Sequence, residues 1–363
     1  MVRISDILKK KMQATTPAAE TKPAVPSEAH PALPQEEPAR EPIPRLHEMH
    51  IAKAMRETEP DIERSRAVYS KGIQLTKEIL NNAREEKPID LAKIKDLVAE
   101  IVDSLVSSDR ELSNLFYEHS QENYLYNHMV NVLIMSVEVG LGLGYNKSKL
   151  HELGLAAFLH DIGMVKVENL ALEPRALTDE EHNQIKEHPV YGAEILSKIN
   201  GIPEAVICAA GEEHERMNGK GYPRMISDGE ISEYGRIIGA VDVYEALTHE
   251  RAHRKKYLPN EAVKEIITAE SSLFDPAVLR VLISQVGIYP IGSWLELNSN
   301  EICKVINTND ELPLRPVVSI IFDGAGNRLE DPRVVNLAAQ SNFFVKRPLA
   351  DEEVSQKVKE EVR

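Results

Sequence analysis

Residues 158–163 read Phe-Leu-His-Asp-Ile-Gly and end an apolar segment, which predicts a buried helix over residues 147–159. A histidine and an aspartate therefore lie directly at the C-terminal end of this helix. A second strongly apolar helix is predicted upstream, at residues 127–143, and it carries His128 near its start. A single histidine near a helix end is usually a cap or a core residue, so the interpretation depends on what accompanies these residues.

Residues of the ligand type recur further along the chain. His188 precedes a proline, His214 begins a glycine-containing stretch, and Asp242 lies inside the apolar segment 237–243. A carboxylate buried there is costly unless a metal ion or a salt bridge satisfies it. Imidazoles combined with carboxylates suit Fe, Mn or Zn, so the ordered set indicates a metal centre. The set comprises His128, His160, Asp161, His188, His214 and Asp242.

The motifs resemble those of the HD-GYP family. Residues 158–163 look like the signature of the HD superfamily. Residues 214–223 read His-Glu-Arg-Met-Asn-Gly-Lys-Gly-Tyr-Pro and resemble the family's hallmark, including its Gly-Tyr-Pro end. The stretch 178–181, followed by His188 and a proline, fits the family's spacing between these motifs. The resemblance covers roughly residues 120–290 and is more specific for family than for activity.

This resemblance implies a mainly α fold: an HD-type helical bundle with a binuclear metal centre. It implies a phosphodiesterase that opens cyclic di-GMP to linear pGpG, with further cleavage to GMP as an option, through a metal-activated hydroxide. It implies two divalent ions, with Fe or Mn favoured and Zn as an alternative. The implied metal ligands are His128, His160, Asp161, His188, Glu213, His214 and Asp242, of which His160 and Asp161 are catalytic, and the implied substrate contacts are Tyr222, Lys166, Arg251 and Arg254.

Three positions depart from the family pattern. Glu213 stands where the family has the first of two adjacent histidines, which changes the charge of the second ion's site. Met164 stands where the family has a lysine, and Lys166 lies two residues further on. The trinuclear members carry a glutamate where this chain has Tyr124, so the sequence predicts two ions and no third.

The segments on either side of the central region differ from it in composition and hydrophobic pattern. Residues 1–45 form a Pro/Ala/Glu-rich tail that is predicted to be disordered. Residues 46–118 show helical periodicity without a catalytic cluster and predict a helical scaffold. The predicted metal-dependent domain spans residues 119–288. A small β-rich domain is expected at residues 289–347, from β-like runs at 294–297, 302–306 and 317–322, and a charged tail at 348–363.

Composition excludes several classes of protein. The chain has 58 acidic and 43 basic residues, and a net charge of −15 argues against binding to polymeric nucleic acid. No run approaches the roughly 18 apolar residues of a membrane helix, and the N-terminus lacks the apolar core of a signal peptide. Cys208 and Cys303 each lie in an apolar stretch and are predicted to be buried packing residues. We therefore expect a cytoplasmic protein.

Two alternatives to an active cyclic di-GMP phosphodiesterase stay open. Glu213 and Met164 are compatible with a degenerate, non-catalytic signalling module that binds a cyclic dinucleotide or protein partners. The second alternative is an HD-type hydrolase that acts on another phosphoester, such as a related cyclic dinucleotide. The helices of residues 46–118 are compatible with signalling partners or a homodimer.

Overall fold

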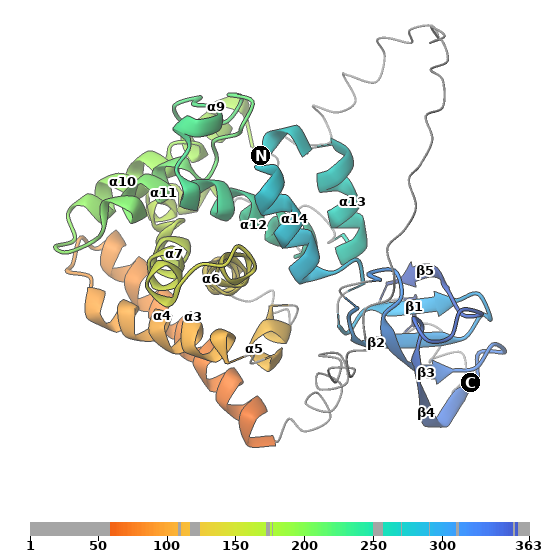
Figure 1. Ribbon diagram of the computed structural model, residues 1–363. Coiled ribbons are helices and arrows are strands. Elements are labelled where there is room, and N and C mark those ends of the chain that lie inside the picture. The colour runs from red at the N-terminus through yellow and green to blue at the C-terminus, as the bar shows by residue number, and fades with distance from the viewer. Residues whose placement is uncertain are drawn as a thin grey trace, which may run out of the picture. The chain divides into compact units, whose positions relative to one another are not determined.

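The computed structural model describes residues 59–107, 110–116, 124–171, 175, 177–249, 257–269, 271–289, 291–309, 312–350 and 353–354. The predicted disordered tail and the predicted substrate contacts Arg251 and Arg254 lie outside these residues. The described residues form a mainly helical domain and a small antiparallel sheet, as the sequence predicts (Figure 1).

Two helices of the predicted N-terminal region come first, α3 (Glu59–Arg84) and α4 (Leu91–Val106). Asp90 ends the break between them, because its side chain accepts hydrogen bonds from the backbone N–H groups of Ala92 and Lys93 at 3.0 and 3.3 Å. A carboxylate directly before an apolar helix is a favoured N-cap residue.

The central helices follow, with α6 at their centre. This helix is buried over most of its length and packs against α3, α4, α7, α12 and α14, which is where a mostly apolar helix must lie. The elements are α5 (Arg110–Leu115), α6 (Tyr124–Gly142), α7 (Lys147–Leu159), η1 (Ile162–Lys166), α8 (Glu168–Ala171), α9 (Asp179–Ile185), α10 (His188–Ser197), α11 (Glu204–Glu212), η2 (Asp228–Glu230), α12 (Glu233–Thr248), α13 (Pro259–Ala269), η3 (Ser271–Leu273) and α14 (Pro276–Val286).

One hydrophobic core joins the N-terminal helices to the central ones. It includes Val68 of α3, Ile101 of α4, Ile134 of α6 and Val286 of α14. In Figure 1, α6 and α7 are seen nearly end on, with α3 and α4 beside them. The N-terminal helices are therefore packed directly on the helix that carries His128.

The sheet contains β1 (Trp294–Leu297), β2 (Ile302–Asn307), β3 (Val317–Phe322), β4 (Arg328–Asn336) and β5 (Val345–Leu349). The strand order is β4-β3-β2-β1-β5, and all neighbours are antiparallel. The three predicted β-like runs became β1, β2 and β3, whereas β4 and β5 were not predicted. Both unpredicted strands lie at the edges of the sheet and contain a proline, which an edge strand tolerates.

Two further expectations concern membranes and cysteines. In the described part of the chain, no helix is both long and apolar enough to cross a membrane. Both cysteines are free thiols, and Cys303 is buried in the sheet as predicted. The prediction was wrong for Cys208, which is partly exposed because the apolar stretch around it forms only one face of α11.

Candidate metal centre

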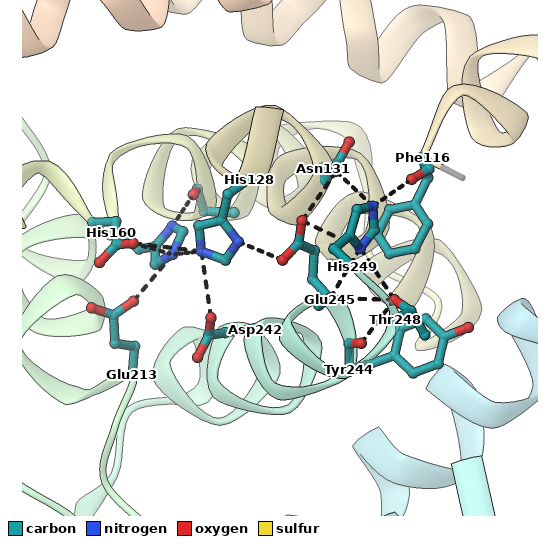
Figure 2. Close-up of polar contacts among 12 residues, drawn as sticks. Phe116, His128, Asn131, His160, Glu213, Asp242, Tyr244, Glu245, Thr248 and His249 are labelled. Carbon is teal, nitrogen blue, oxygen red and sulfur yellow. Dashed lines mark hydrogen bonds and ion pairs between the residues drawn. The ribbon is translucent and has the colours of Figure 1, made fainter. Parts of the chain in front are cut away.

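The ligand-type residues predicted from the sequence come together at the centre of the helical domain. His128 and Asp242 lie within helices α6 and α12. The others lie at helix ends: His160 directly after α7, Glu213 directly after α11, and His188 at the start of α10. The ligands at helix ends approach the cluster from several directions. His128 and Asp242, which lie within their helices, are held in place by the packing of the core (Figure 2).

The first group of side chains, here called the inner group, comprises His128, His160 and Asp242, all buried. The Nε2 atoms of the two histidines lie 3.2 Å apart, and Nε2 of His128 lies 3.4 Å from Oδ1 of Asp242. The Nδ1 of His160 lies 2.7 Å from the carbonyl oxygen of Ala157. Since a carbonyl only accepts, Nδ1 carries a proton, and Nε2 is the ring nitrogen that faces the group.

The second group, here called the outer group, comprises His188, Glu213 and His214, of which His214 is partly exposed. The Nε2 atoms of its two histidines lie 3.1 Å apart, and Nε2 of His188 lies 3.3 Å from Oε1 of Glu213. The carbonyl oxygen of Ile185 accepts from Nδ1 of His188 at 2.7 Å. The ring orientation is therefore fixed in the same way as that of His160.

Two carboxylates extend from one group to the other. Asp161 places Oδ2 3.5 Å from Nε2 of His128 and Oδ1 3.3 Å from Nε2 of His188. Glu213 places Oε2 3.5 Å from Nε2 of His160, in addition to its contact with His188. A carboxylate with one oxygen facing each group can bridge two ions.

The donor set fits divalent metal ions. Both oxygens of Glu213 are buried and receive no hydrogen bond, and the side chain is 0% exposed. Within each group, two imidazole Nε2 atoms face each other at 3.2 or 3.1 Å, so their lone pairs need a cation between them, either a proton or a metal ion. A cation among these atoms removes both penalties, because it pairs the buried carboxylate and accepts the lone pairs.

The electrostatics of the metal-free protein agree with this fit. Burial opposes protonation of His128, but the neighbouring carboxylates, that of Glu245 first, raise its pKa to about 9. Burial also opposes protonation of His188, and Glu213 contributes most to raising that pKa to about 9. Burial raises the pKa of Glu213 and, with the charge of His188, lowers that of His214 well below its usual value. The cluster thus attracts positive charge at both groups.

Two glycines allow the backbones that carry the ligands to touch. A Cβ atom on Gly163 would lie 2.0 Å from the carbonyl oxygen of His188, so η1 and α10 meet without a side chain between them. A Cβ atom on Gly239 would lie 2.3 Å from the carbonyl oxygen of Glu213, where α12 crosses the end of α11. Any larger residue would separate the inner group from the outer one.

The Gly-Tyr-Pro stretch folds back over the outer group. The ring of Tyr222 stacks on His214, with centroids 4.6 Å apart, and its backbone N–H donates to the carbonyl oxygen of His214 at 3.2 Å. Glu215 anchors the loop by accepting from the backbone N–H of Arg224 at 2.7 Å. Lys186 also approaches this tyrosine, with Nζ 5.8 Å from the ring centroid of Tyr222.

Of the remaining predicted substrate contacts, Lys166 is not brought into this cluster. Lys166 is exposed, and its ammonium lies 3.4 Å from Oε1 of Glu86 at the end of α3. Arg251 and Arg254 fall outside the described residues, so their predicted role stays a prediction.

Three residues near the cluster were not predicted as functional. Glu245 and Asn131 support His128, and each lies three residues after a ligand on the same helix face. That spacing is the signal that could have found them. Lys186 had no such signal, because it is brought to Tyr222 by the turn between α9 and α10.

Comparison with known proteins gives the family. Residues 112–278 match the HD domain, and residues 294–357 match a KOW domain associated with HD domains. The chain is 30% identical over 290 residues to a cyclic di-GMP phosphodiesterase of Pseudomonas aeruginosa, covering 79% of this chain and 70% of that protein. It is 30% identical over 234 residues to a cyclic di-GMP phosphodiesterase of Borreliella burgdorferi, covering 64% of this chain and 62% of that protein.

A solved structure agrees in fold. An HDG"Y"P protein from Bdellovibrio bacteriovorus superposes with a TM-score of 0.54 at 19% identity, covering 66% of this chain and 77% of that one. The HD match, the long alignment with the Pseudomonas protein and the Gly-Tyr-Pro loop beside His214 agree with one another. The chain therefore belongs to the HD-GYP family of HD-domain proteins.

Proposed function

We propose that this protein is a metal-dependent phosphodiesterase that hydrolyses a cyclic dinucleotide, with cyclic di-GMP opened to linear pGpG as the preferred reaction. The observation that carries the proposal is the pair of imidazole–carboxylate groups joined by Asp161, whose two oxygens lie 3.5 and 3.3 Å from His128 and His188. Two relatives that are 30% identical are named cyclic di-GMP phosphodiesterases.

The charges of the site suit an anionic substrate. Asp161, Glu213 and Asp242 contribute three negative charges, while histidine ligands are neutral when bound. Two divalent ions bring four positive charges, which leaves a net charge of about +1 for a phosphodiester that carries −1. Such ions supply an activated water as nucleophile and neutralise the charge that develops on the phosphoryl oxygens.

The side chains of the protein bind and orient. The carboxylates of Asp161 and Glu213 hold the two groups at a fixed separation, because each contacts a histidine of both. Burial raises the pKa of Tyr222, so its phenol stays protonated and can donate a hydrogen bond at the mouth of the site. We propose Lys186 as a further cation that meets the phosphates there, alongside the predicted contacts Arg251, Arg254 and Lys166.

We propose Fe or Mn over Zn as the native metal. Every ligand is an imidazole or a carboxylate, and Glu213 adds a hard oxygen donor where the family has a nitrogen. We also propose the cytoplasm as the compartment, since both cysteines are free thiols. Signalling partners or a second copy bound through the N-terminal helices stay a prediction.

The test is metal content and turnover measured on the same full-length preparation. The protein is purified anaerobically with Fe(II) or Mn(II), and cyclic di-GMP is compared with other cyclic dinucleotides. About two ions per chain and appearance of the linear dinucleotide are expected. If only another cyclic dinucleotide gave a linear product, the proposed substrate would be wrong. If the protein bound no metal, the proposed metal centre would be wrong.

A non-catalytic signalling module is the second candidate, because Glu213 and Met164 alter charge at the site. A histidine at position 213 would leave the bound site one charge more positive, so Glu213 weakens its attraction for phosphate. Metal and tight nucleotide binding without product, for every cyclic dinucleotide tried, would favour this candidate over the enzyme.

A further inference from the structure

A chain of buried hydrogen bonds connects the inner group to α3. The Nδ1 of His128 lies 2.7 Å from Oε2 of Glu245. The other oxygen of Glu245 accepts a hydrogen bond from the amide nitrogen of Asn131 at 3.1 Å. The hydroxyl of Tyr69, on α3, donates to the amide oxygen of Asn131 at 2.8 Å. Figure 2 shows His128, Glu245 and Asn131 in this order.

Each residue in this chain of hydrogen bonds fixes the orientation or the tautomer of the next one. Glu245 is acceptor-only when ionised, so it selects the His128 tautomer that presents Nε2 to the inner group. Asn131 could face Glu245 with either end of its amide. Because Tyr69 donates to the amide oxygen, the amide nitrogen is the end left to face the carboxylate.

Packing excludes water from these hydrogen-bonded residues and holds them close together. The exposed fractions are 2% for His128, 1% for Glu245, 0% for Asn131 and 9% for Tyr69. One turn along α3 from Tyr69, a Cβ atom on Gly72 would lie 3.0 Å from Cγ2 of Val130 on α6. This close approach of α3 to α6 is what brings the phenol within reach of Asn131.

A second contact holds Glu245 from the other side. His249 lies 2.9 Å by Nδ1 from the carbonyl oxygen of Glu245 and 2.9 Å by Nε2 from the carbonyl oxygen of Phe116, directly after α5. The support of His128 therefore reaches the N-terminal helices at two points, and α3 contributes a side chain to it.

We propose that Tyr69 is a positioning residue of the metal centre: acting through Asn131 and Glu245, it fixes the orientation of His128 and so the affinity of the inner group for its metal ion. The predicted scaffold of residues 46–118 is then part of the site, and a displacement of α3 changes metal occupancy. This inference rests on the proposed function only in requiring that the inner group binds metal.

The test compares Tyr69→Phe with a matched control, Tyr234→Phe. The Tyr234 hydroxyl donates to Glu152 at 2.8 Å and the residue is 6% exposed, so the control removes a partly buried tyrosine hydrogen bond away from the inner group. Mn(II) dissociation constants and melting temperatures of the metal-free proteins are measured. Tyr69→Phe should weaken the tighter Mn(II) site about tenfold, the low end of the effect of outer ligand partners. Tyr234→Phe should leave it unchanged at a similar loss of melting temperature.

A double variant separates positioning from general loosening. Glu245→Gln should weaken the same Mn(II) site more than Tyr69→Phe does, and the double variant should be no worse than Glu245→Gln alone, because Tyr69 acts through Glu245. Equal Mn(II) affinity of Tyr69→Phe and wild type would overturn the proposal, and so would additive losses or absence of Mn(II) binding by the wild type. Mn(II) bound as expected without turnover would overturn the phosphodiesterase function and leave this proposal standing.

Discussion

The inner and outer groups use similar ligands but differ in how those ligands are held. The inner group is fully buried, and its His128 is backed by the carboxylate of Glu245. In the outer group His214 is partly exposed, and His188 is backed only by a backbone carbonyl. A carboxylate partner makes an imidazole a stronger ligand than a carbonyl does. The comparison teaches that the inner group should bind its ion first and more tightly.

The largest expected effect comes from removing what the two groups share. Asp161→Ala takes a carboxylate from both, so both ions should be lost and turnover should fall by at least about 10³-fold. Metal analysis of the purified variant, beside a steady-state assay, provides the measurement. Retention of about two ions per chain would show that Asp161 does not bridge.

Glu213→Ala tests whether the inner and outer groups bind their ions independently. The outer group loses the carboxylate of Glu213 and keeps the shared Asp161, while the inner group keeps His128, His160 and Asp242. We expect metal content to fall from about two ions per chain to about one, with turnover abolished. Glu213→His, which restores the usual family residue, should keep both ions. Simultaneous loss of both ions in Glu213→Ala would mean that the groups do not load independently.

Proton competition should affect both groups alike. The metal-free pKa values of His128 and His188 are both about 9, above the usual 6.5. Metal must displace these protons, so affinity should rise with pH by about tenfold per unit for each proton released and level off above pH 9. The same protons stabilise the metal-free fold fully below pH 6.5, and this stability is lost as pH rises through about 9.

Mn(II) titrations and melting curves at pH 7, 8 and 9 measure both effects. Affinity that does not change with pH would contradict protonated histidines in the metal-free protein.

The smallest expected effect concerns the mouth of the outer group. Lys186→Met removes a partly buried cation beside Tyr222 and should raise KM about tenfold with little change in kcat, the scale of one charged hydrogen bond. Adding Met164→Lys, which restores the family's usual cation, should recover part of the loss. The control is Lys198→Met, at an exposed position after α10, and it should leave KM unchanged. An equal effect of both lysine variants would point to general electrostatics.

The sequence predicted the helical framework because its signals are local. Asp90 caps α4, and Thr178 and Glu181 form a capping box at the start of α9; each of these signals lies within one turn of its helix. The apolar segments around His128 and Asp242 became buried helices for the same reason. Strands β4 and β5 escaped prediction because edge strands are largely exposed and lack a clear alternating pattern.

Family motifs indicated which ligand-type residues to examine, but sequence could not give their surroundings. Nothing in residues 46–118 marks Tyr69, since its partner Asn131 lies 62 positions away. Lys186 meets Tyr222 only because two loops converge. Long-range pairs of this kind depend on the packing of whole helices, and one sequence carries no record of it.

The close backbone contacts at Gly163 and Gly239 have a consequence for how this site changes during evolution. They set the spacing of the ligand-bearing segments through main-chain atoms, which side-chain substitutions leave in place. A ligand residue can therefore be replaced while the spacing of the backbone stays the same, as the glutamate at position 213 illustrates. A single substitution at a ligand position can therefore change the bound metal or the turnover while Gly163 and Gly239 keep the ligand-bearing segments in place.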